Sequence, residues 1–237
     1  MDQTTITIII CAGIILLLCV LLAIATFSSD KFLEVYKELS KKTTSSAYTI
    51  SSFFSIVNTK YLQQKIKVVP INEVGGDFYN SKKKIIGLNT NGQTSLASFA
   101  VVAHELGHAY QDIAEQKLRS FHNLRLSGMI IGKLFLPIII ATIALLFFIE
   151  NYILVLIGGG LLLLIIVLLA IIIKAKTISI EKDASKRGLE LLNEFLPDSE
   201  VKECKKLLDS ARLTYWGDLI KLLLGWSGLT SKTKMFK

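Results

Sequence analysis

Cysteine is scarce in this chain, which contains three among its 237 residues. Cys11 and Cys19 fall inside a long apolar run and Cys204 falls in a polar segment, so the three cannot build a disulfide framework. We assign no metal-binding role to Cys204, because neither of its sequence neighbours is a histidine or a cysteine. This cysteine usage is compatible with a reducing cytosolic environment for the polar part of the chain.

A basic stripe interleaved with aromatic residues is also missing, although the formal net charge is +8. The lysines are scattered among acidic residues instead of lying along one segment. This distribution lacks the electrostatic footprint of a nucleic-acid-binding surface, and we expect no nucleic acid partner. No internal repeat is visible either, so the chain is not a repeat array.

Long apolar segments, by contrast, are abundant: hydrophobic residues make up 51% of the chain, and the mean hydropathy is +0.52. Three segments reach the roughly 20 apolar residues that cross a bilayer, namely 6–27, 129–149 and 152–173. The first predicts an uncleaved anchor, because no positive charge precedes it and its apolar core is too long for a signal peptide. Only Glu150 and Asn151 separate the other two, which predicts a tight membrane hairpin.

The distribution of lysine and arginine predicts the orientation of these spans. Neither the N-terminal stub nor the Glu150-Asn151 turn carries a basic residue, whereas both polar flanks do. By the positive-inside rule, we expect a multi-pass protein of the cell membrane whose large polar segments face the cytoplasm. The basic residues of the flanks are Lys31, Lys37, Lys41 and Lys42 after the first span, and Lys174, Lys176, Lys182, Lys186 and Arg187 after the third.

Histidine is as scarce as cysteine, yet two of the three histidines stand in the run His104-Glu105-Leu106-Gly107-His108. On a helix, residues four apart share one face, so both imidazoles can bind one Zn²⁺ while Glu105 serves as general base beside it. Chance produces such a run in very roughly one protein in a hundred of this length. The motif is typical of a zinc hydrolase, and its surroundings must support it.

The segments around the motif predict a small α+β unit. We expect strands over 65–74, interrupted at Pro70, and over 84–88, the second presenting an edge that aligns a substrate as an added strand. Thr94 or Ser95 is expected to cap a helix that holds the motif and ends near 120. Further helices are expected over 30–42, 180–195 and 200–213, followed by an amphipathic helix over 213–229 that lies on the membrane.

A catalytic zinc ion usually has three protein ligands and one open position, so a third ligand must come from elsewhere. Glu181 is the first candidate, and Asp183 is an alternative ligand or a partner that orients a histidine. Two predicted spans separate His108 from Glu181, and an even number of crossings returns the chain to the face that it left. The oxyanion-stabilising residue is not identified, although His122 and Tyr215 are candidates.

The order of these segments resembles the YugP-type family of neutral zinc metallopeptidases of bacterial membranes. The resemblance rests on residues 77–80 (DFYN), 103–111 (AHELGHAYQ), 181–185 (EKDAS) and 211–215 (ARLTY). It implies a zinc-dependent peptidase with His104, His108 and Glu181 as ligands and Glu105 as the catalytic glutamate. The chain departs from the family at Leu106, where valine is common, and at Tyr110, where isoleucine is common.

The fold class that follows is a mainly α integral membrane protein with three transmembrane helices and a small cytosolic α+β zincin-like catalytic domain split around a hairpin. Its expected parts are the anchor 1–27, the catalytic part 28–128, the hairpin 129–173 and the helical part 174–237. The expected function is a membrane-bound zinc endopeptidase, with peptides or proteins as substrates and the bilayer as a partner. The alternative is a non-catalytic membrane scaffold or assembly factor with a structural zinc site, against which the intact Glu105 argues.

Overall fold

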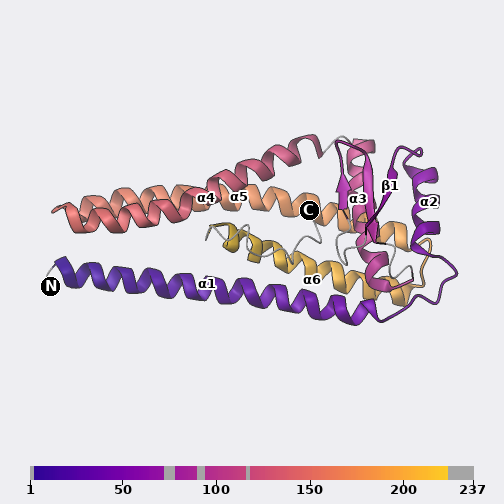
Figure 1. Cartoon of the computed structure of the whole chain (residues 1–237), viewed down its shortest axis with the longest axis horizontal. Coiled ribbons are helices and arrows are strands. Elements are labelled where there is room, and N and C mark those ends of the chain that lie inside the picture. Colours follow the sequence, from indigo (N-terminus) through magenta and orange to yellow (C-terminus); the bar gives the residue numbers. More distant parts are fainter. Residues whose placement is uncertain (1–2, 72–77, 90–93, 116–117, 224–237) are drawn as a thin grey trace.

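Helices dominate the computed structural model, which describes residues 3–71, 78–89, 94–115 and 118–223. Most of them run along the length of an elongated molecule, while the short strands gather near one end (Figure 1). The prediction of a mainly helical fold with a small sheet is confirmed. The elements are α1 (Gln3–Ser40), α2 (Ile50–Tyr61), β1 (Lys67–Ile71), β2 (Phe78–Asn80), β3 (Ile85–Asn89), α3 (Leu96–Glu115), α4 (Leu118–Phe148), α5 (Tyr152–Leu192) and α6 (Asp198–Leu223).

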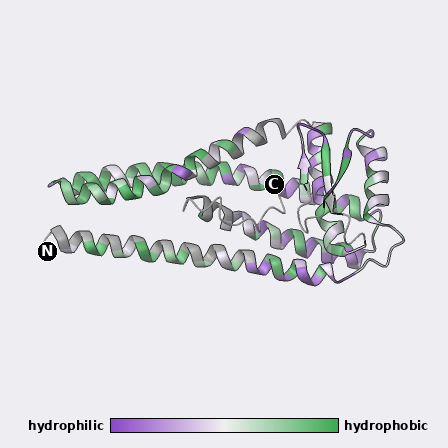
Figure 2. Cartoon of the chain, in the orientation of Figure 1, coloured by the Kyte–Doolittle hydropathy of each residue, from purple (hydrophilic) through white to green (hydrophobic). Residues whose placement is uncertain are grey.

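Helices α4 and α5 form the expected apolar hairpin. Within the described residues, Leu126–Phe148 and Tyr152–Leu192 are the two helical stretches long and apolar enough to cross a membrane. The Asn151 side chain caps α5 by accepting a hydrogen bond from the backbone N–H of Leu154 at 3.2 Å. Figure 2 shows hydrophobic residues dominating the paired helices toward their turn and hydrophilic residues gathering toward the strands.

Two of the long helices run through points where the sequence predicted a break. Helix α5 continues without interruption to Leu192, so the segment expected to begin a new helix at 180 is the C-terminal part of the same helix. Helix α6 likewise passes 213 and reaches Leu223, packed along α1. No proline interrupts either stretch, and the polar residues there are compatible with helix. Residues 224–229 of the predicted amphipathic helix lie outside the described residues.

Helix α1 contains both the first predicted span and the helix expected over 30–42. Many of its side chains before residue 30 lie outside the described residues, so the span at 6–27 stays a prediction. The start of α1 lies at the same end of the molecule as the α4–α5 turn, and α3 lies toward the other end (Figure 1).

The three strands form one sheet in the order β1-β3-β2, with β1 parallel and β2 antiparallel to β3. The expectation that 84–88 presents an edge is therefore wrong, because Ile85–Gly87 pair with neighbours on both sides. Pro70 lies inside β1, where an edge position tolerates its missing N–H. The sheet is tied to α3 through Asp112, which accepts hydrogen bonds from Tyr79 Oη at 2.6 Å and Lys84 Nζ at 2.5 Å.

Helix α3 is the most deeply buried element of this end of the molecule. Ser95 caps it, since its Oγ accepts a hydrogen bond from the backbone N–H of Ser98 at 3.2 Å, and the described helix spans Leu96–Glu115. Phe99 packs against Phe53 of α2 with ring centroids 5.7 Å apart, and Phe53 meets Phe195 edge to face at 5.0 Å. Burial of α3 on nearly all sides fixes where its two histidines lie.

The backbones of α3 and α5 touch where these helices cross. A Cβ atom added to Gly107 would lie 2.1 Å from the carbonyl oxygen of Ala184, and one added to Gly188 would lie 2.5 Å from that of Ala103. Each helix thus contributes an alanine and a glycine four residues apart, which allows close approach at two successive turns. No side chain larger than hydrogen fits at either glycine.

We expect Gly107→Ala and Gly188→Ala each to lower the stability of the purified protein by about 1–3 kcal/mol, because the added methyl group forces the two backbones apart. Thermal unfolding followed by circular dichroism measures this effect. Gly160→Ala is the control, since a Cβ there would meet nothing within 4 Å. It should leave the melting temperature unchanged or slightly higher, as alanine favours helix over glycine. Equal melting temperatures for all three variants would contradict the close crossing.

Candidate metal centre

Three side chains that the sequence nominated as metal ligands meet where α3 and α5 cross. Among the described residues, His104, His108 and Glu181 form a group whose ligand atoms all lie within 4.8 Å of one another. The Nε2 atoms of both histidines lie 3.2 Å from Oε2 of Glu181. Two ligands of a tetrahedral zinc ion, each about 2.0–2.2 Å from it, lie roughly 3.3–3.5 Å apart, so the group has the dimensions of a zinc site.

The ring nitrogen of each histidine that does not face Glu181, Nδ1, has a polar partner of its own. Nδ1 of His104 lies 3.0 Å from Oγ of Ser185, and Nδ1 of His108 lies 3.1 Å from Oε1 of Gln111. The amide oxygen only accepts, so Nδ1 of His108 carries a proton, and Nε2 is the nitrogen that faces Glu181. Partners of this kind orient metal-binding imidazoles in known zinc sites.

Gln111 connects His108 to helix α5. Its side chain is only 1% exposed, and its Nε2 donates hydrogen bonds to the carbonyl oxygen of Ile180 at 2.9 Å and to Oδ2 of Asp183 at 2.8 Å. Both donors are used, which fixes the amide with its oxygen toward the imidazole. The structure thus places Asp183 behind Gln111, outside the group of three, where its Oδ2 also accepts from Nε of Arg187 at 3.0 Å.

The electrostatics of the group favour an ionised carboxylate. Burial by itself raises the pKa of Glu181, but His108 and His104 outweigh this and hold the pKa well below its usual range. Burial lowers the pKa of His104, whereas for His108 the nearby Glu181 overcomes burial and raises the pKa to about 9. The buried carboxylate therefore needs a positive partner, and a metal cation bound by two neutral imidazoles meets this need.

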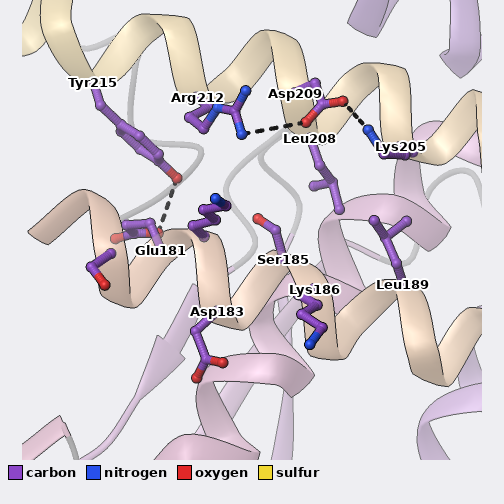
Figure 3. Close-up of a pocket in the computed structure, with 12 residues that line it drawn as sticks. Glu181, Asp183, Ser185, Lys186, Leu189, Lys205, Leu208, Asp209, Arg212 and Tyr215 are labelled. Atoms are coloured by element: carbon purple, nitrogen blue, oxygen red, sulfur yellow. Dashed lines mark hydrogen bonds and ion pairs between the residues drawn. The ribbon is translucent and has the colours of Figure 1, made fainter.

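Two further side chains border the group. Glu105 follows His104 on α3, is 3% exposed, and adds to the raised pKa of His108 through its charge. Tyr215 of α6, a candidate oxyanion donor in the sequence, donates from its hydroxyl to Oε2 of Glu181 at 3.0 Å (Figure 3). The side chain of His122, the other candidate, lies outside the described residues.

Sequence reasoning missed Gln111 and Ser185 as partners of the histidines. Their positions carry a weak signal, because Gln111 follows His108 by three residues and Ser185 follows Glu181 by four, so each shares a helical face with a candidate ligand. Polar residues at these spacings are common on helices, and only the crossing of α3 and α5 shows which imidazole each one meets.

His104, His108 and Glu181 are buried together and could hold a metal ion, and two histidines with one carboxylate are residue types that bind zinc. Residues 13–226 match the family described as "putative neutral zinc metallopeptidase", and the chain belongs to this family. The resemblance noted in the sequence is thereby confirmed, and zinc is the metal that the family description specifies. No curated protein and no solved structure matches the chain.

We expect Gln111→Leu to weaken zinc binding by about 10- to 100-fold, because His108 loses the acceptor that sets its tautomer and ring orientation. Competition with a chelating zinc indicator measures the affinity. Thr177→Val is the control, since it removes a buried polar group on α5 whose hydroxyl donates to the carbonyl oxygen of Ile173 at 3.0 Å. Unchanged zinc affinity in Gln111→Leu would show that the amide does not position the imidazole.

Proposed function

We propose that this protein is a membrane-bound zinc-dependent endopeptidase that hydrolyses peptide bonds at the cytoplasmic face of the membrane. One observation carries the proposal: His104, His108 and Glu181 converge in a buried group of zinc-site dimensions although 73 residues or more separate the glutamate from the histidines. Membership in the zinc metallopeptidase family supports the same reaction.

In this proposal, His104, His108 and Glu181 would hold the ion. A zinc ion bound there supplies the Lewis acidity that makes water nucleophilic at neutral pH. Glu105 accepts the proton of the attacking water and returns it to the leaving amine as general acid. Its neighbours restrain its position, because α3 is buried on nearly every side.

Tyr215 suits the task of stabilising the developing oxyanion. Its hydroxyl lies 3.0 Å from Glu181 Oε2, at the border of the metal group, and α6 is a separate helix from those that hold the ligands. A phenol donates one hydrogen bond, which can turn from the carboxylate to a substrate oxygen within the same reach. The proposed general base, Glu105, thus lies on α3, and the proposed oxyanion donor, Tyr215, lies on α6.

The membrane part of the proposal rests on α4 and α5, with the first predicted span, 6–27 in α1, as a third crossing. The split catalytic domain then consists of 28–128 and 174–237, joined through the hairpin 129–173. The apolar run of α5 ends near Ile173, and Glu181 follows about 12 Å further along the helix, at 1.5 Å per residue. In this proposal, the metal group lies just outside the bilayer, on the side of the basic flanks.

We expect Glu105→Gln to bind zinc stoichiometrically but to lose about 100- to 10,000-fold of the peptidase activity, because the amide cannot accept the proton of water. Cleavage of a broad peptide mixture, followed by mass spectrometry, measures activity, and elemental analysis measures zinc. A His104→Ala/His108→Ala variant should lose the zinc. Stoichiometric zinc without any Glu105-dependent cleavage would favour the scaffold alternative, and zinc retained by the double variant would refute the site.

We expect Tyr215→Phe to lower kcat by about 100- to 1,000-fold with little change in KM, because one oxyanion donor is lost while the ring remains. Steady-state kinetics on a fluorogenic peptide separate the two constants. Tyr48→Phe is the matched control, since that ring packs edge to face against Phe195 at 5.1 Å, remote from the metal group. A Tyr215→Phe enzyme with normal kcat would remove the hydroxyl from the mechanism.

A further inference from the structure

A cavity of about 410 Å³ lies between α5 and α6 and borders the candidate metal centre. Glu181 and Tyr215 line one end of it, and Leu189 and Leu208 line the other (Figure 3). Its volume falls in the range of about 300–1,000 Å³ typical of ligand pockets. Because Glu181 and Tyr215 form part of its wall, a molecule at that end of the cavity lies beside the metal group.

The length of the cavity fits a short stretch of peptide. Glu181 and Leu189 are eight residues apart on α5, which corresponds to about 12 Å along the helix axis. An extended chain covers this distance with roughly four residues at about 3.3 Å each. Lys186 stands about 7.5 Å from Glu181 along the same axis, so it faces a position about two residues from a bond placed at the metal.

Basic side chains predominate in the lining of the cavity. Four basic side chains line it, two from α5 and two from α6: Lys182, Lys186, Lys205 and Arg212. Of the three acidic residues that line it, Glu181 belongs to the metal group, and Asp183 is already paired with Gln111 at 2.8 Å and with Arg187 at 3.0 Å. Asp209 remains, and both Lys205 and Arg212 share it. The cations therefore outnumber the carboxylates that can neutralise them.

The two lysines of α5 are the least compensated of these cations. Lys182 makes no ion pair with any described residue. Lys186 lies 3.8 Å from Glu190, but both side chains are more than 60% exposed, and such a pair is weak and screened by solvent. Both lysines are therefore available to a ligand carboxylate.

We propose that the cavity between α5 and α6 is a substrate subsite that selects peptides carrying a carboxylate within about two residues of the scissile bond, through Lys182 and Lys186. The inference rests on the proposed peptidase function and specifies its substrate class. An acidic side chain and a free chain end offer the same carboxylate chemistry. The apolar residues Leu189 and Leu208 accept a hydrophobic side chain beyond it.

Binding and cleavage of matched peptides test the subsite separately. The probes are fluorescent peptides that differ only in glutamate, glutamine or lysine at one of the positions beside the scissile bond, each with a free or an amidated C-terminus. Anisotropy measures their binding to zinc-loaded Glu105→Gln protein, and the native enzyme gives kcat/KM. We expect glutamate to be preferred over glutamine by about three- to tenfold, and the preference to fall at about 1 M salt.

Lys182→Glu and Lys186→Glu should abolish or invert this preference, while Lys202→Glu should retain it, since Lys202 is an exposed lysine of α6 outside the cavity. A preference confined to free C-termini assigns the subsite to the chain end, and one that survives amidation assigns it to an acidic side chain. Equal glutamate-to-glutamine ratios in native and variant proteins would overturn the subsite even if cleavage depends on Glu105. Binding preference without any cleavage would instead refute the peptidase function and keep the anionic-peptide subsite.

Discussion

The close crossing of α3 and α5 is the constraint on which the site depends. Carbonyl oxygens of Ala184 and Ala103 occupy the space in which side chains at Gly107 and Gly188 would stand. The contact brings Glu181 to 3.2 Å from both imidazoles, a distance that a separation of one or two ångströms more would destroy. Gly107 lies inside the motif itself, so the same five residues supply both the ligands and the close packing.

Burial at this crossing sets the chemistry of the group. A carboxylate and two imidazoles in a nearly water-free environment are costly unless their charges are matched, and here a positive charge stabilises the ionised glutamate. The surrounding polar side chains are arranged around the ring nitrogens that face away from the group. Gln111 and Ser185 thus hold the imidazoles, and Asp183 holds Gln111.

Helix α6 adds a third side to the site formed by α3 and α5. It packs along α1 and against α3 and α5, and its Tyr215 reaches Glu181 from the side opposite α3. The same helix forms one wall of the cavity that leads to the metal group. Helix α6 therefore contributes Tyr215, which lies beside the proposed reaction centre, and one wall of the proposed substrate cavity. It supplies none of the three proposed ligands.

The sequence by itself determined the features that depend on local spacing. These are the helical pair His104 and His108, the apolar hairpin at Glu150 and Asn151, the start of α3 at Thr94 or Ser95, and Glu181 as a candidate partner of the two histidines. Only the tertiary structure decided that β3 is a central strand, that α5 and α6 continue past the expected breaks, and that Gln111 and Ser185 hold the imidazoles. The spacing of residues that share one face of a helix or strand follows from backbone geometry, so it can be recognised in the sequence. Pairing across helices and strands depends on which backbones approach one another, and here that approach is allowed by two glycines whose role no local pattern revealed.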